Sequence, residues 1–115
     1  MSSLNLASRA YAAASVNKTT REQEADVFRM VTARLQAARE SGAIARVRAL
    51  ADNRRLWMAV TDLVRDGGNP LPPATRAGII SIGQSVQREM DSDEPSFDFL
   101  IMINKHIAEG LSGNP

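Results

Sequence analysis

The sequence predicts an all-α protein, a compact bundle of about five helices. Apolar residues recur at intervals of three and four along most of the chain, which places them on one face of a helix. Short runs rich in glycine, proline or serine separate these segments. The best strand candidate, GIISIG at 78–83, lies in a segment that opens with Pro72 and Pro73, and proline suits the first turn of a helix. The length fits a single helical domain, 1–115.

Turn and capping residues set the expected helix boundaries. The first expected helix is short and alanine-rich, the second has Thr20 as its N-cap and ends at Gly42, and the third ends at a DGGNP turn. The polar stretch DSDEPS separates the fourth helix from the fifth. The expected spans are about 4–15, 20–41, 44–66, 73–91 and 96–109.

The apolar stripe of the second helix consists of Phe28, Val31, Leu35 and Ala38. The fourth helix carries Ile79, Val86 and Met90 on one side. Gly83 falls among these residues and would let a neighbouring helix approach closely. We therefore expect both helices to turn one face toward a common core.

The stretch NRRLW at 53–57 lies on the third helix. At about 100° per residue, Asn53 and Trp57 fall on its apolar side and Arg55 falls opposite. We expect Trp57 to be a core anchor whose indole N–H needs a partner, and Asn53 to be a buried amide that joins two helices. Arg54 lies at the border, where it can pair with an acid from another helix. Only Arg55 is expected to be free to meet a partner.

The fifth helix has more apolar surface than a core-facing helix usually needs. Its apolar residues span about 200°, whereas a stripe nearer 100° is usual. Either the other helices wrap this helix, or part of it faces a partner. Asn104 falls within the arc and is expected to be a second buried amide. The arc contains Phe97, Phe99, Leu100, Ile101, Ile103, Ile107 and Leu111, with Met102 further round.

Charge is unevenly distributed although the net charge is only +1. Residues 1–57 hold ten Lys/Arg and five Asp/Glu, while residues 58–115 hold four and eight. The two halves could neutralise each other by packing together, or the basic half could form an interaction face.

Location is predicted from three features. The chain has no cysteine, which fits a reducing compartment. The longest apolar run, FLIMI at 99–103, is far below the ~20 residues that span a bilayer. The first residues lack the basic and continuous apolar regions of a signal peptide. We expect a cytoplasmic protein with no membrane association.

The sequence contains no recognisable catalytic or metal-binding pattern. The single histidine, His106, falls on the polar side of the fifth helix. DSDEPS fails as a calcium loop because Pro95 and Ser96 occupy the fifth and sixth positions, where glycine is needed at the sixth. Neither a phosphate-binding loop nor a nucleophile elbow is present. We expect a protein that is not an enzyme and uses no cofactor or metal.

Three separated blocks resemble the FlaF family of flagellar biosynthesis regulators, small bacterial proteins of about this length. The blocks are NRRLW at 53–57, GNPLPPATRAGIIS at 68–81, and IN…I…GL at 103–111. The pair Ala10 and Tyr11 fits in order and spacing, so the resemblance covers nearly the whole chain. The matched residues are interpreted as fold-specifying positions: Asn53, Arg54, Trp57, Leu71, Pro72, Arg76, Ala77, Ile79, Ile80, Asn104 and Gly110.

The resemblance implies a role in flagellum assembly and motility. Family members are needed for flagellin production and are understood to act after transcription. They serve as flagellin-binding export chaperones that link flagellin synthesis to secretion, in opposition to or partnership with the regulator FlbT. The family supplies no catalytic or ligand-binding residues for this chain.

Surplus apolar surface suits such a chaperone, because an amphipathic flagellin helix could pack into a groove. The candidate partner-binding residues are Phe99, Met102, Ile103 and Arg55, and the methionines expected to make the surface adaptable are Met30, Met58, Met90 and Met102. The alternative is an RNA-binding post-transcriptional regulator of flagellin message that uses the basic half; few aromatics and no RNA-module motif make nucleic acid a less favoured partner. A third possibility is an adaptor that binds only another regulator.

Overall fold

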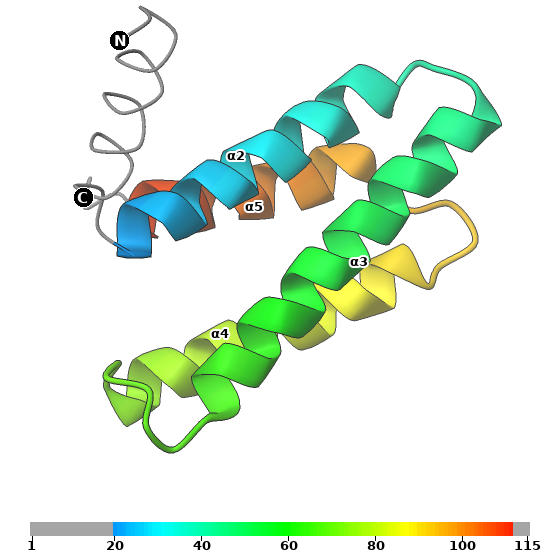
Figure 1. Ribbon diagram of the computed structural model, residues 1–115. Coiled ribbons are helices and arrows are strands. Elements are labelled where there is room, and N and C mark those ends of the chain that lie inside the picture. The colour runs from blue at the N-terminus through cyan, green and yellow to red at the C-terminus, as the bar shows by residue number, and fades with distance from the viewer. Residues whose placement is uncertain (1–19, 112–115) are drawn as a thin grey trace, which may run out of the picture.

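The computed structural model describes residues 20–111, which form four helices (Figure 1). They are α2 (Thr20–Ala38), α3 (Ala43–Arg65), α4 (Pro73–Met90) and α5 (Phe97–Leu111). No strand occurs in this part of the chain, so the predicted all-α class is confirmed. The first expected helix, 4–15, lies outside the described residues.

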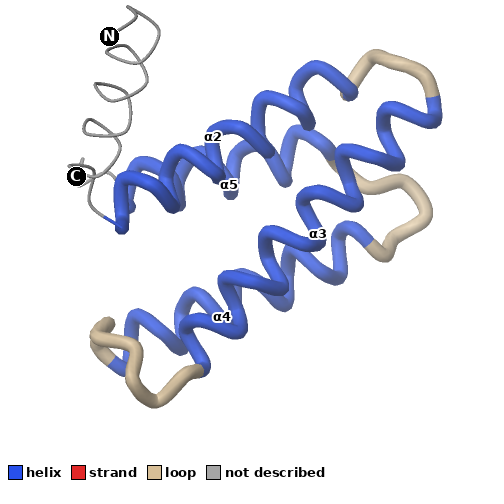
Figure 2. The backbone as a smooth tube through the Cα atoms, viewed as in Figure 1, coloured by secondary structure: helices blue, strands red, loops and turns tan. Residues whose placement is uncertain are grey.

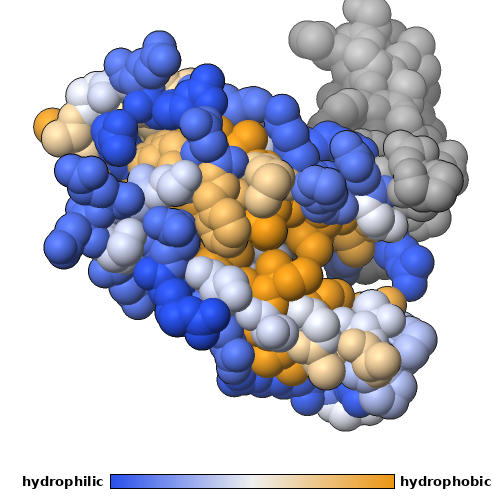
Figure 3. Space-filling model, turned by 180° about the vertical axis from the view of Figure 1, so that it is seen from behind, coloured by the Kyte–Doolittle hydropathy of each residue, from blue (hydrophilic) through white to orange (hydrophobic). Residues whose placement is uncertain are grey.

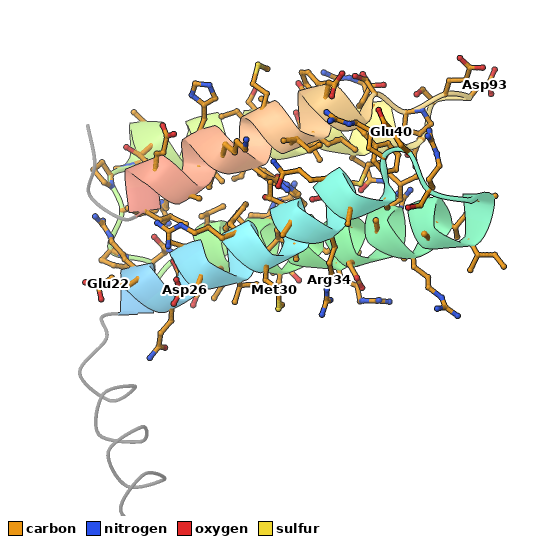
Figure 4. The ribbon with its side chains drawn as sticks, turned by 90° about the horizontal axis from the view of Figure 1, so that it is seen from above. Glu22, Asp26, Met30, Arg34, Glu40 and Asp93 are labelled. Carbon is orange, nitrogen blue, oxygen red and sulfur yellow. The ribbon has the colours of Figure 1, made fainter. Side chains whose placement is uncertain are left out.

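The helices form two layers, with α2 and α3 in one and α5 and α4 in the other (Figures 1 and 4). Helix α2 packs on α5, and α3 packs on α4. The two pairs meet near the α2–α3 and α4–α5 loops and diverge toward the opposite end of the molecule (Figure 2). At this open end lie the starts of α2 and α4 and the ends of α3 and α5. The molecule therefore has a closed end and an open end.

The helix boundaries agree with the predicted ones to within two residues, except at the end of α2. That helix ends at Ala38, three residues before the predicted end, because the chain turns there: the Ser41 backbone N–H donates to the Ala38 carbonyl at 3.0 Å. Gly42, in an extended conformation, precedes α3 as its N-cap. Thr20, the predicted N-cap of α2, is already helical.

The buried core is built from apolar residues of all four helices. The predicted stripe on α2 is buried throughout, from Phe28 to Ala38. The ring of Phe28 meets Trp57 edge to face, with centroids 5.7 Å apart and an interplanar angle of 85°. This arrangement is the favourable one for aromatic pairs, and it anchors α2 to α3.

Two amides and an indole form a hydrogen-bonded network inside this core. The Trp57 indole Nε1–H donates to Asn104 Oδ1 at 2.9 Å, and Asn104 Nδ2 donates to Asn53 Oδ1 at 2.8 Å. Asn53 Nδ2 in turn donates to the sulfur of Met90 at 3.4 Å. Asn53 and Asn104 are fully buried. The network joins α3, α4 and α5, as the positions of the two amides predict.

Gly83 allows α3 and α4 to pack closely. A Cβ atom at this position would lie 3.1 Å from Thr61 Oγ1 and 3.4 Å from Cε3 of Trp57. The first distance is tighter than ordinary van der Waals contact, so a larger residue would require the Thr61 side chain or the helices to shift. The close approach predicted for Gly83 is confirmed.

Ion pairs connect the basic first half to the acidic second half near the closed end. Arg54 Nη1 contacts Asp91 Oδ1 at 2.9 Å, and Arg39 pairs with Asp98. Arg46 lies over the ring of Phe97, with its guanidinium carbon 4.6 Å from the ring centroid. The uneven charge is therefore partly neutralised by packing, one of the two outcomes that the sequence left open.

Candidate functional site

The open end of the bundle contains an apolar groove of about 210 Å³. All four helices and the α3–α4 loop contribute to it. The lining side chains are apolar except for Glu24 and Asn69. The lining residues are Glu24, Val27, Phe28, Leu56, Ala59, Val60, Leu63, Val64, Asn69, Leu71, Ile79, Ile107 and Leu111. Seen from behind, apolar side chains gather between the two helix pairs (Figure 3).

Two large apolar side chains at this groove stand well out into solvent. Val27 is 44% exposed and Leu63 is 54% exposed. Each lies at the edge of the apolar face of its helix, about 100° round from a buried neighbour, Phe28 for Val27 and Val64 for Leu63. Exposed apolar groups clustered in a depression are typical of interaction sites, whereas single scattered ones need no explanation.

Helix α5 carries two apolar rows, which accounts for its wide apolar arc. One row is buried and includes Phe97, Leu100, Ile101, Asn104 and Ala108. The other has a residue at every fourth position and is only partly buried: Phe99, Ile103, Ile107 and Leu111. Ile107 and Leu111 also line the groove. Helix α5 is therefore not wrapped on all sides, and its second row continues from the groove toward the closed end.

The structure brings together only some of the predicted partner-binding residues. Phe99 and Ile103 share the partly buried row of α5. Met102 is 46% exposed and does not line the groove. Arg55 lies on another helix, α3, and its Nη2 contacts Asp52 Oδ1 at 2.7 Å. The Arg55 side chain is 74% exposed, in agreement with its predicted position on the solvent side of α3, and the acid that it contacts lies one helical turn away in the sequence.

The prediction of adaptable surface methionines was wrong for Met90. This residue is buried and accepts the hydrogen bond from Asn53. Met30 and Met58 are exposed but do not line the groove. Figure 4 shows Met30 on the side of α2 turned away from α5, together with Arg34. Sequence reasoning missed Val27, Leu56 and Leu63. The breadth of the apolar stripe near the end of α3 could have indicated the last two.

The clearest electrostatic features lie outside the groove. Asp52 receives hydrogen bonds from Arg55 and from Arg34 Nη1, the latter at 3.2 Å, and these contacts lower the pKa of its carboxyl group below 3.8. The pKa of Asp91 is also lowered, by hydrogen bonds from Gln87 and then Arg54. Neither carboxylate lines the groove, where Glu24 is the one ionisable lining residue.

The residues that match the family blocks do not share one environment: some are in the core, some line the groove and some are exposed. Asn53, Trp57 and Asn104 form the buried network, and Arg54 makes the ion pair with Asp91. Leu71 and Ile79 line the groove. Pro72 is the N-cap of α4, Arg76 Nη1 donates to the Asp66 carbonyl at 3.1 Å, and Ile80 is partly buried. Ala77 and Gly110 are exposed, and nothing in the structure explains why these residue types stand there.

Residues 20–111 contain neither a metal-binding cluster nor a membrane-spanning helix. No cluster of three or more histidine, cysteine, aspartate or glutamate side chains is placed to hold a metal ion in that range. Nor does any of its helices combine the length and apolar character needed to cross a membrane.

These features define a small all-α protein whose most distinctive surface is an open apolar groove. A family model described as "Flagellar protein FlaF" matches residues 7–111, and the chain belongs to this family of flagellar proteins. Comparisons with curated proteins and with solved structures found no match.

Proposed function

We propose that this flagellar protein is a cytoplasmic export chaperone that binds flagellin and links its synthesis to secretion. The observation that carries the proposal is the apolar groove at the open end, to which all four described helices contribute. The family match supports a flagellar role. The groove supports binding, rather than catalysis, as the form of that role.

The shape of the groove favours a helix as its ligand. Its volume of about 210 Å³ is below the ~300–1,000 Å³ of pockets that enclose small molecules. It also continues into the partly buried row on α5. An amphipathic helix places apolar residues three and four positions apart, and these can anchor along such a surface. The terminal segments of flagellin are helices of this kind that lack their partners before the filament assembles.

Affinity for such a helix should come mainly from the apolar area removed from water. This contribution is about 25 cal/mol per Å² before the costs of association and ordering. Val27 and Leu63 should contribute the most buried apolar area on binding, because much of each side chain is exposed in the free protein. A charge at either position would have to be desolvated when the flagellin helix binds.

A matched pair of valine substitutions tests this proposal. Val27 lines the groove, whereas Val47 is 65% exposed and lies outside it. Val27→Asp should weaken binding of monomeric flagellin at least tenfold, as measured by isothermal titration calorimetry. Val47→Asp should leave the affinity within about twofold, because it adds the same charge elsewhere. Circular dichroism would confirm that both variants fold. Equal affinities of the two folded variants would contradict the groove as the binding site.

RNA binding by the basic half is the alternative function. Of its arginines, Arg34 and Arg55 share Asp52, and Arg46 lies over Phe97. Within residues 20–111, every phenylalanine and tryptophan ring is buried or partly buried and only the His106 ring is exposed, which leaves little aromatic surface for stacking on bases. These contacts favour flagellin over RNA as the proposed partner. Binding of the regulator FlbT is a further proposal, which the family resemblance alone supports.

A further inference from the structure

The groove lies beside the point where residues 1–19 join the described fold. Helix α2 begins at Thr20, and Glu24, Val27 and Phe28 of its first turns line the groove. A link of the four residues 16–19 can extend about 13–14 Å. This exceeds the ~10 Å diameter of a helix. Residues 4–15 can therefore reach back to the groove of the same molecule.

Residues 4–15 have a sequence pattern that fits an apolar groove. At about 100° per residue, their larger apolar side chains fall within an arc of about 160°. This arc contains Leu4, Leu6, Ala7, Ala10, Tyr11 and Ala14, while Asn5, Ser8, Arg9 and Ser15 fall outside it. The alanines would allow close approach to the groove walls, and Leu4 and Tyr11 would act as anchors.

Length and charge agree with this occupant. Twelve helical residues are about 18 Å long, and the groove-lining part of α3, from Leu56 to Val64, extends about 12 Å. The charged side chains of residues 1–19 are Arg9 and Lys18, both positive. The ionisable side chain in the groove lining is the acidic Glu24. The family match also begins at residue 7, so it includes most of this segment.

We propose that residues 4–15 dock as a helix in the apolar groove of their own chain when no partner is bound. The docked segment covers Val27 and Leu63, the two large apolar side chains that are exposed at the groove.

A spin label provides a direct test that requires no flagellin. The chain has no cysteine, so Ser8→Cys creates a single attachment site for a nitroxide, outside the apolar arc. The methyl NMR signals of Ile79 and Ile107, which line the groove, should broaden in the labelled full-length protein. The signal of Ile44, an exposed residue outside the groove, should stay sharp. Sharp signals at all three positions would overturn the proposal, as would equal broadening.

Two controls define the contact. Adding Tyr11→Asp to the labelled protein should restore sharp signals at Ile79 and Ile107, because the anchor is lost; persistent broadening would contradict docking through the apolar arc. Mixing labelled protein with an isotopically labelled, nitroxide-free copy should leave the copy's groove signals sharp. Broadening there would show docking between two molecules and would overturn the intramolecular proposal.

Discussion

Replacing Asn104 with leucine tests the buried network that joins three of the helices. Asn104 accepts a hydrogen bond from the Trp57 indole at 2.9 Å and donates one to Asn53 at 2.8 Å. Leucine is similar in size, so the substitution creates little cavity, but it leaves the indole N–H and the Asn53 carbonyl oxygen without partners. Each unpaired buried group costs about 1–3 kcal/mol. The free energy of unfolding should therefore fall by about 2–6 kcal/mol, a large share of the ~5–15 kcal/mol typical of a domain.

A double substitution separates the network from simple packing. Asn53→Leu alone leaves the Asn104 amide unpaired and should cost about 1–3 kcal/mol. Asn53→Leu with Asn104→Leu leaves only the Trp57 N–H unpaired, so its cost should again be about 1–3 kcal/mol and not the sum of the two single costs.

Urea denaturation, followed by circular dichroism and by the fluorescence of the single tryptophan, would give the three free energies. Additive costs would refute the reasoning. A cost for Asn104→Leu below about 0.5 kcal/mol, the level of ordinary surface substitutions, would refute it as well.

Three further predictions follow from particular contacts. Gly78→Ala should stabilise α4 by about 0.5–1 kcal/mol, because a Cβ atom there meets nothing within 4 Å. The Gly83→Ala variant should be at least about 1 kcal/mol less stable than the Gly78→Ala variant, because its Cβ atom approaches Thr61. Equal thermal unfolding of the two variants would contradict the close packing. The pKa values of Asp52 and Asp91 are lowered from 3.8, so the unfolded chain takes up protons first as the pH falls. The free energy of unfolding should stay constant above about pH 5 and fall below it, more gradually in Asp52→Asn/Asp91→Asn, and an identical acid profile of that variant would exclude these groups as a cause. Arg55→Ala should cost less than about 1 kcal/mol in urea denaturation, since its side chain is 74% exposed and exposed ion pairs contribute little; a larger loss would show that Arg55 is part of the core packing.

The features that depend only on which side of its own helix a residue occupies could be predicted from the sequence. Helical periodicity placed Trp57, Asn53 and Asn104 inside, because a position on a helix determines the side to which a residue points. Gly83 could be read in the same way, as a gap in an apolar face. The hydrogen bonds among Trp57, Asn53 and Asn104 could not be predicted, since they depend on how the helices meet.

The candidate site was less predictable because it depends on the angle between helix pairs. The sequence indicated excess apolar surface on α5, and the row that includes Phe99 and Ile103 is indeed only partly covered. Val27 and Leu63 became recognisable as groove residues only once the diverging pairs placed them together. Met90 was misjudged for a related reason: its sulfur accepts a hydrogen bond from Asn53, which an apolar pattern does not reveal.

The salt dependence of flagellin binding tests the central proposal most directly. Apolar contact is hardly screened by ions, so the affinity of the protein for monomeric flagellin should change only modestly between 50 and 200 mM salt. For RNA held by arginines, the affinity should fall about a hundredfold over that range if five phosphates are contacted on a single strand. We predict measurable, weakly salt-dependent flagellin binding that Val27→Asp weakens at least tenfold. Tight RNA binding that falls steeply with salt, with no detectable flagellin binding, would contradict the account.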